Sequence, residues 1–197
     1  MAIICPMAQP NQRIGLLGGS FDPPHQGHLH LSNEALKRFR LTKIWWLVTP
    51  QNPQKNHEPK QLAKRIAQAR DLVTDPRIIV TDIESQLDTR RTAETLRKLV
   101  HLNCKTQFVW LMGADNLASI HHWHEWRWIF NHVQVGIIAR AGNQLRAQMG
   151  VAARVYRTKR VPERGSHLLV KTKPPAWCYL NAPLISTASR DLRKSDF

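Results

Sequence analysis

Short, nearly continuous apolar runs alternate along the chain with segments in which apolar residues recur at helical spacing. The apolar runs predict buried strands at Arg13–Gly18, Lys43–Thr49, Arg77–Thr81, Gln107–Met112 and His132–Ala139. The helical spacing predicts helices over Gly27–Phe39, Gln61–Val73 and Thr92–Leu102, and a helical stretch that runs to about Phe130. Because strands and long helices alternate, we expect parallel crossovers. The predicted fold class is α/β, a Rossmann-like doubly wound parallel sheet.

The pattern weakens after Arg140. A helix over Gln144–Val155, strands at His167–Lys171 and Trp177–Leu180, and a short last helix over Ala188–Lys194 are the predictions there. No change of composition marks a domain boundary, so we expect a single domain over residues 1–197, with residues 1–12 as a flexible N-terminus.

Net charge, apolar content and cysteine number limit the kinds of molecule that this protein can be expected to bind and where it can be expected to reside. The 197 residues carry a formal net charge of +15, which favours anionic partners such as nucleic acid, a membrane surface or phosphorylated small molecules. No run approaches the roughly 18 apolar residues that a membrane span needs. The three cysteines, Cys5, Cys104 and Cys178, are scattered. This argues against a disulfide framework and favours a reducing, cytoplasmic location.

The densest candidate chemistry is the segment Gly18–His28 (GGSFDPPHQGH), between the first predicted strand and the first predicted helix. Gly18 and Gly19 permit close backbone approach and unusual φ angles. His25 and His28 flank a helix N-terminus, whose free N–H groups and positive dipole end attract phosphate. The alternative is a glycine- and proline-rich turn with surface histidines. The spacing matches neither a Walker A loop nor GxGxxG.

This segment resembles GxFDPxHxGH, the signature of a nucleotidyltransferase superfamily, and the chain as a whole is similar to the nicotinate-mononucleotide adenylyltransferase family. The likeness continues in order along the chain, in WLVTPQNPQK (46–55), TAETL (92–96), GAD (113–115) followed by Trp123, and STASR (186–190). Two positions depart from the family pattern. Ile185 stands where a serine is common, and Arg91 stands where an aromatic residue is common.

The resemblance implies adenylyl transfer from ATP to nicotinate mononucleotide, giving nicotinate adenine dinucleotide and pyrophosphate in NAD biosynthesis, with Mg²⁺ accompanying ATP. It implies catalytic roles for His28, His25 and Arg190. ATP-binding residues would be Gly18, Gly19, Ser20, His25, His28, Gly113, Asp115, Ser186, Thr187 and Arg190. Mononucleotide-binding residues would be Ser20, Phe21, Lys55, Thr92 and Trp123. Neither a dedicated protein metal site nor a membrane or specific nucleic-acid partner is expected.

In the strand order 3-2-1-4-5 of such a sheet, the first and fourth strands are neighbours, which would bring GGS and GAD side by side. Several of these residues have a plainer alternative. Asp115 fits a helix N-cap before Leu117, Ser186 and Thr187 fit the cap of a last helix, and Lys55 fits a solvated lysine in a basic loop.

The histidine-rich stretch at 121–128 raises the possibility of a metal site, because His121 and His124 are three residues apart and Glu125 follows. It is not HExxH and no third ligand is evident. Tryptophans 45, 46 and 110, with Trp126, Ile129 and Phe130, are predicted to be core.

Other functions remain open at this point. Nicotinamide-mononucleotide, pantetheine-phosphate and cytidylyl transferases share the HxGH loop, although TAETL and GAD with Trp123 discriminate against the last two. From a different class, the charge of +15 is compatible with a nucleic-acid-binding module. The basic residues of this chain, however, are dispersed rather than gathered in one arm, which argues against such a module.

Overall fold

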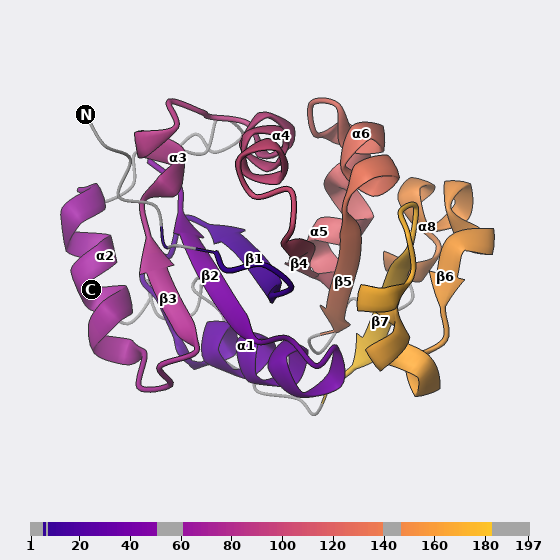
Figure 1. Cartoon of the computed structure of the whole chain (residues 1–197), viewed down its shortest axis with the longest axis horizontal. Coiled ribbons are helices and arrows are strands. Elements are labelled where there is room, and N and C mark those ends of the chain that lie inside the picture. Colours follow the sequence, from indigo (N-terminus) through magenta and orange to yellow (C-terminus); the bar gives the residue numbers. More distant parts are fainter. Residues whose placement is uncertain (1–5, 7, 51–60, 140–146, 183–197) are drawn as a thin grey trace, which may run out of the picture.

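The computed structural model describes residues 6, 8–50, 61–139 and 147–182. Its centre is a parallel sheet, which Figure 1 shows face on. The seven strands lie in the spatial order β3 (Ile78–Thr81), β2 (Lys43–Val48), β1 (Arg13–Gly19), β4 (Gln107–Gly113), β5 (Gln134–Ala139), β7 (Trp177–Asn181) and β6 (Arg160–Val161). The predicted order 3-2-1-4-5 is confirmed, with two further strands added beyond β5.

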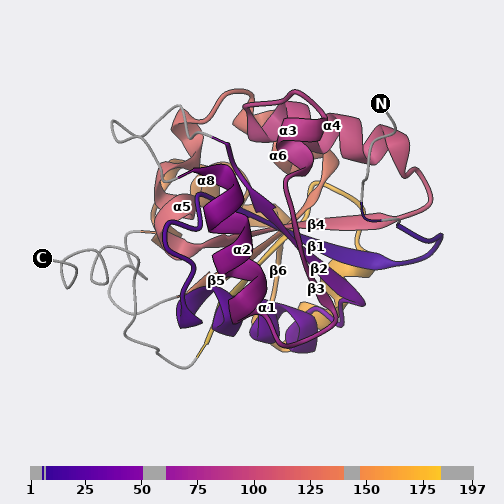
Figure 2. The same cartoon turned by 90° about the vertical axis from the view of Figure 1, so that its left-hand side faces the viewer.

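Helices cover both faces of the sheet, as in a doubly wound fold (Figure 2). One face packs against α1 (Gln26–Arg38), α2 (Leu62–Leu72) and the 3₁₀ segment η3 (Glu163–Lys171). The other face packs against α3 (Ile83–Gln86), α4 (Thr92–Leu102), α5 (Ala114–Ser119), α6 (Trp126–His132) and α8 (Val151–Val155). Two further 3₁₀ turns are η1 (Ile120–His122) and η2 (Arg157–Lys159). None of the helices in the described part of the chain is long and apolar enough to cross a bilayer.

Alternation along the strands divides the core into two layers. Successive side chains of a strand point to opposite faces, so Trp45 joins the cluster under α3–α6 and Trp46 joins the cluster under α1 and α2. Both rings are fully buried. Trp110, Trp126, Ile129 and Phe130 are buried as well, which confirms the predicted core positions.

The strand predicted at His167–Lys171 is wrong, because this segment belongs to η3. Leu169 and Val170 are adjacent in sequence, yet both side chains are buried in the same cluster, whereas Leu168 is exposed. Neighbouring residues of a strand would face opposite ways. Five apolar or amphipathic residues in a row do not distinguish a strand from a buried helical turn.

Other predicted elements are corrected in extent. The helical stretch to Phe130 is interrupted between η1 and α6, where Glu125 adopts a left-handed φ of 50°. The helix predicted over Gln144–Val155 is interrupted: Ala147 and Gln148 are helical, and α8 begins after Gly150, its N-cap. Residues 144–146 lie outside the described residues. Neither α3 nor β6 was predicted, and the last helix at Ala188–Lys194 also lies outside the described residues.

Candidate active site

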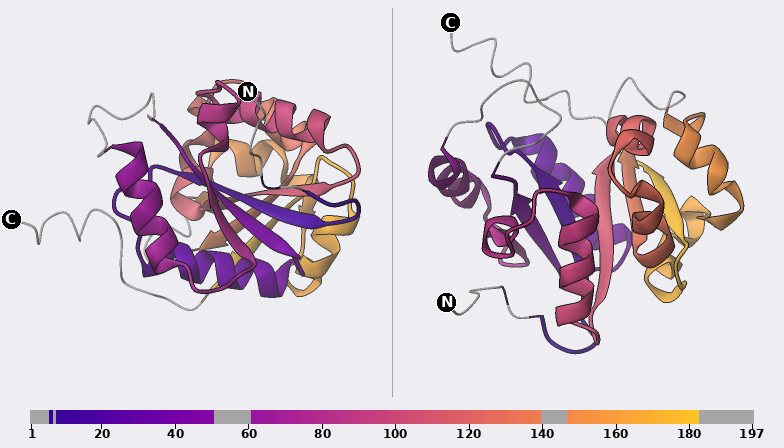
Figure 3. Two further views of the ribbon diagram at one scale, coloured as in Figure 1. Left: turned by 60° about the vertical axis from the view of Figure 1, so that its left-hand side comes forward. Right: turned by 90° about the horizontal axis from the view of Figure 1, so that it is seen from above.

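The carboxyl ends of the two central strands bring the first loop and the GAD segment together. In the parallel pair β1 and β4, Leu17 lies opposite Leu111, so Gly18–Gly19 and Met112–Gly113 leave the sheet at the same edge. Figure 3 shows β1 and β4 side by side in the middle of the sheet. Ligands of open α/β sheets bind beyond the carboxyl ends of strands at such a point. The expected proximity of GGS and GAD is therefore confirmed.

His25 and His28 form a reciprocal cap at the start of α1. The Gly27 N–H donates to His25 Nδ1 at 3.0 Å, and the His25 N–H donates to His28 Nδ1 at 3.2 Å. The two rings lie 3.9 Å apart between centroids. Because Nδ1 of each ring accepts a hydrogen bond, the neutral ring carries its proton on Nε2. Both histidines thus have a defined Nε2 donor, and His25 is buried rather than a surface residue.

Phe21 fixes the middle of the loop. Its side chain is 2% exposed and stacks on Trp46 at 4.8 Å between centroids, with the His28 ring 4.6 Å away on an inclined plane. Its backbone is left-handed, with φ of 47°. The buried ring leaves mainly the backbone of Phe21 available to a ligand.

Close packing explains one of the two glycines of the loop, Gly18. Neither Gly18 nor Gly19 has a φ in the left-handed range; the residue that does is Phe21. A Cβ on Gly18 would lie 2.4 Å from Cη2 of the Trp110 ring. Gly18 is therefore required for contact with a buried tryptophan, which the sequence did not indicate.

At the end of β4, Gly113 is the N-cap of α5 and Asp115 lies in its first turn. The Asp115 side chain is exposed and caps no backbone N–H of this helix. The alternative interpretation of Asp115 as an N-cap is therefore wrong. The carboxylate is available at the same edge of the sheet as the first loop.

Thr92 and Trp123 come from two elements on the α4 face. Thr92 is the first residue of α4, as predicted. Trp123 directly follows η1, is half-buried and makes an edge contact with Trp110 at 6.4 Å between centroids.

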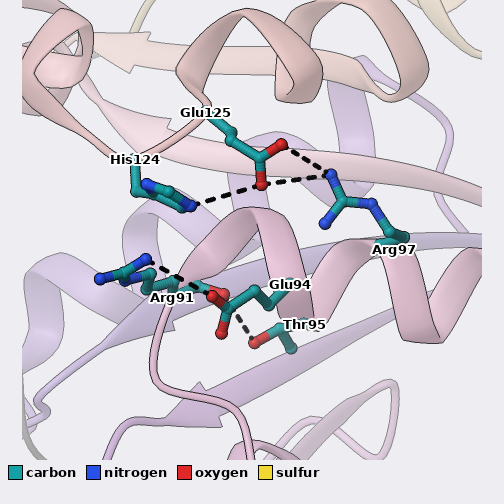
Figure 4. Close-up of polar contacts among 6 residues, drawn as sticks. All are labelled: Arg91, Glu94, Thr95, Arg97, His124 and Glu125. Atoms are coloured by element: carbon teal, nitrogen blue, oxygen red, sulfur yellow. Dashed lines mark hydrogen bonds and ion pairs between the residues drawn. The ribbon is translucent and has the colours of Figure 1, made fainter.

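The two elements are linked by an ion pair. Arg97 Nη2 of α4 donates to both oxygens of Glu125, at 3.1 and 3.2 Å (Figure 4). Glu125 stands two residues after Trp123, so the pair ties the tryptophan segment to α4. Arg91, at the N-cap of α4, lies 3.8 Å from Glu94 and makes no side-chain cap.

A buried carboxyl group, that of Glu84, is hydrogen-bonded to α4. Glu84 of α3 accepts from Thr95 Oγ1 at 3.4 Å, and Thr95 Oγ1 lies 2.8 Å from Thr89 Oγ1. Burial raises the pKa of Glu84 to about 7, although the Thr95 hydrogen bond opposes the shift. Sequence reasoning missed Glu84, because nothing in its local pattern marks it as buried.

Arg65 was also missed as a functional candidate. It lies in α2, inside the helix predicted at Gln61–Val73, and is fully buried. Its position four residues before the buried Ala69, on the apolar side of the helix, was the available signal.

The remaining predicted site residues, Lys55, Ser186, Thr187 and Arg190, lie outside the described residues, as does Ile185. Within the described ranges, no group of three or more histidine, cysteine, aspartate or glutamate side chains is placed to hold a metal. In the histidine-rich stretch, His124 Nε2 lies 3.5 Å from Glu125, and the His121 ring lies 3.8 Å from that of His122.

Comparison with known proteins places this arrangement in context. Residues 16–179 match the cytidylyltransferase-like family model. A probable nicotinate-nucleotide adenylyltransferase of Ruegeria sp. (strain TM1040) is 51% identical over 92% of this chain and 96% of its own. That of Cereibacter sphaeroides (strain ATCC 17025) is 53% identical over 91% and 96%.

The fold is similar to those of solved structures. The Plasmodium falciparum nicotinic acid mononucleotide adenylyltransferase complexed with NaAD has a TM-score of 0.68 and 19% identity, over 93% of this chain and 83% of that one. The same protein complexed with APC gives a TM-score of 0.68. At this identity the likeness establishes the fold.

Proposed function

This chain belongs to the nicotinate-nucleotide adenylyltransferases, a family of cytidylyltransferase-like nucleotidyltransferases, and on that premise we propose how its residues divide the reaction. The enzyme transfers the adenylyl group of ATP to nicotinate mononucleotide in NAD biosynthesis. A phosphate oxygen of the mononucleotide forms a bond to the α-phosphorus, and the bond from that phosphorus to the bridging oxygen breaks. Pyrophosphate is the leaving group. We also propose that the enzyme acts in the cytoplasm.

The mononucleotide phosphate is already a nucleophile near neutral pH, so the protein needs no general base. Catalysis then depends on holding the two phosphates in line and on stabilising the charge that develops between them. Mg²⁺ would accompany ATP and would neutralise part of the phosphate charge, and it would need few protein ligands because it gives up its waters reluctantly.

The observation that carries the proposal is the reciprocal cap of α1. It holds both histidines with Nδ1 turned to the backbone and the proton on Nε2. In the proposal, Nε2 of His28 donates to the α-phosphate and His25 donates to a neighbouring phosphate oxygen. The backbone of Gly18, Gly19 and Ser20 lies under the nucleotides, while Gly113 and Asp115 contact the adenosine, with the carboxylate accepting from ribose hydroxyls.

The mononucleotide is assigned to Ser20, the Phe21 backbone, Lys55, Thr92 and Trp123. Trp123 stacks on the pyridine ring, and the free N–H groups at the start of α4 donate to the nicotinate carboxylate. Ser186, Thr187 and Arg190 are assigned to the β- and γ-phosphates, which suit the fixed donors of a guanidinium group.

A pyrophosphate-release assay with ATP and a panel of mononucleotides tests this assignment. An amide would present its NH₂ donor to the donors of α4, which leaves groups unpaired. Two charge-assisted hydrogen bonds, at about 1.5–3 kcal/mol each, give an expected preference of at least about a hundredfold in kcat/KM for nicotinate over nicotinamide mononucleotide. Equal values for the two substrates would contradict the carboxylate site at α4.

A further inference from the structure

Arg65 is a fully buried cation that the reaction scheme above does not use. It lies in the first turn of α2. Among the described residues, its guanidinium donates to three main-chain carbonyls. Nη1 donates to Ser20 O at 2.5 Å and to Thr49 O at 2.8 Å, and Nη2 donates to Pro50 O at 2.9 Å.

These carbonyls belong to the two loops that follow adjacent strands. Ser20 follows β1 and lies in the segment Gly18–His28, which we call the phosphate loop. Thr49 and Pro50 follow β2. A second contact joins the same loops, because Thr49 donates to Gly19 O from its N–H at 3.0 Å and from its hydroxyl at 3.2 Å. Arg65 therefore links three segments of chain at the carboxyl edge of the sheet.

A buried guanidinium requires acceptors and a counter-charge to be tolerated. Burial lowers the pKa of Arg65, and the negative charge of Asp22, a buried residue of the same phosphate loop, partly restores it. The group stays cationic because its ordinary pKa is far above neutral. Its positive charge is thus retained beneath the loop that receives the phosphates.

The hydrogen bond to Ser20 also determines the direction of a backbone donor. The Ser20–Phe21 peptide bond is trans, so its carbonyl and its N–H point to opposite sides. With the carbonyl held toward α2, the Phe21 N–H is turned away from α2. Phe21 itself is left-handed, a conformation that is unfavourable for a large side chain and persists where its surroundings hold it.

We propose that Arg65 is a positioning residue for adenylyl transfer, which clamps the phosphate loop to the end of β2 and sets the orientation of the Ser20–Phe21 peptide between the two substrates. This inference rests on the proposed function. Its effect is expected on both substrates, because Ser20 is assigned to both of them and the Phe21 backbone is assigned to the mononucleotide.

The test compares Arg65→Lys with Arg70→Lys, a matched change at an exposed arginine of the same helix. Lysine keeps the charge but lacks the planar fork that bridges two loops. A displacement of about 1 Å in a reacting group lowers rates by about a hundredfold. We expect kcat/KM for both substrates to fall at least about tenfold in Arg65→Lys. Arg70→Lys should match wild type.

Urea unfolding of each variant separates positioning from stability. A folded Arg65→Lys enzyme with wild-type kcat and KM values overturns the proposal, and so does an activity loss that merely follows the folded fraction. If Arg65→Lys does not fold, Arg65→Gln decides, because it keeps a side-chain NH₂ donor but neither the charge nor the guanidinium fork. A fall in kcat/KM in the folded variant supports the clamp, and unchanged kinetics overturns it. Wild-type enzyme that releases no pyrophosphate would contradict the proposed function instead.

Discussion

At the scale of single residues, the histidines at the start of α1 combine two tasks on two ring nitrogens. Nδ1 of His28 accepts the His25 N–H, and Nε2 is the donor assigned to the α-phosphate. An asparagine places its side-chain oxygen near the position of Nδ1 but has nothing at Nε2. The two tasks can therefore be separated by substitution.

We predict that His28→Asn lowers kcat by at least about a hundredfold while it changes the free energy of unfolding little. Loss of one donor to a developing charge costs about 2.7–4 kcal/mol. Steady-state kinetics and urea unfolding measure the two effects. His28→Ala is the control, because it also removes the acceptor and should lose a further 0.5–2 kcal/mol or so of stability. Near-normal turnover in a folded His28→Asn enzyme would exclude this histidine from the mechanism.

Gly18 gives a prediction about stability rather than binding. Gly18→Ala places a Cβ 2.4 Å from the buried Trp110 ring, which is rigid and cannot move aside without disturbing the core. We expect a loss of about 1–3 kcal/mol in the free energy of unfolding, as is typical of overpacking. Gly19→Ala, whose Cβ would lie 3.4 Å from the Phe21 ring, is the comparison and should lose less. Equal stabilities would show that the Trp110 contact relaxes freely.

At the scale of elements, the segment after η1 and the helix α4 are the proposed walls of the mononucleotide site. Trp123→Ala should raise KM for nicotinate mononucleotide and leave KM for ATP little changed, because base–aromatic stacking is worth about 1–3 kcal/mol. Trp128→Ala removes a ring that stacks on His132 in the same region and serves as the control. A rise in KM for ATP instead would move Trp123 to the adenine side.

The support beneath α4 predicts a pH dependence of stability. The pKa of Glu84 is about 7 in the folded protein and near 4.5 in the unfolded chain, so the folded protein binds the proton more tightly. The stabilisation is complete below about pH 4.5 and is lost as pH rises to about 7. At about 1.4 kcal/mol per unit, the difference amounts to about 3–4 kcal/mol.

Glu84→Gln is the matched variant, because it keeps a hydrogen-bonding side chain that does not titrate. Urea unfolding between pH 4.5 and pH 7.5 or so should show that wild type loses stability relative to Glu84→Gln over this interval. Parallel curves for the two proteins would mean that Glu84 is not the titrating group.

Sequence patterns predicted elements where periodicity is long and missed those that depend on distant contacts. The strands from β1 to β5 and the helices α1, α2 and α4 were predicted within a few residues. The turn η3 was mistaken for a strand, because it is fixed by tertiary contacts such as the hydrogen bond from Ser166 Oγ to Arg38 O.

The same distinction applies to the site. The HxGH loop was found because its residues are consecutive in sequence. The clamp by Arg65 depends on carbonyls 15 to 45 residues away, and the burial of Glu84 depends on how α3 packs against α4. Side-chain type at one position does not report such contacts.

At the scale of the whole molecule, the formal charge of +15 predicts a salt-sensitive encounter with anionic substrates. Raising ionic strength from roughly 0.01 M to 0.15 M shortens the Debye length from about 30 to about 8 Å. We expect kcat/KM for ATP to fall over this range while kcat changes little, as measured by initial rates of pyrophosphate release. A kcat/KM that does not vary with salt would exclude electrostatic steering.

That residues 1–197 form one domain, with residues 1–12 flexible, stays a prediction.

The reciprocal cap of α1 affects the order in which site residues are expected to be lost once the activity is no longer under selection. In many enzymes the loss of an active-site residue stabilises the protein, because function is held in a strained arrangement. Here His25 stabilises the start of a core helix. Selection for a stably folded protein is therefore enough to retain it, without selection for activity. A descendant freed from its metabolic role is expected to lose Trp123 or Asp115 before His25. An intact histidine motif in such a pseudoenzyme would then record the architecture of α1, not surviving activity.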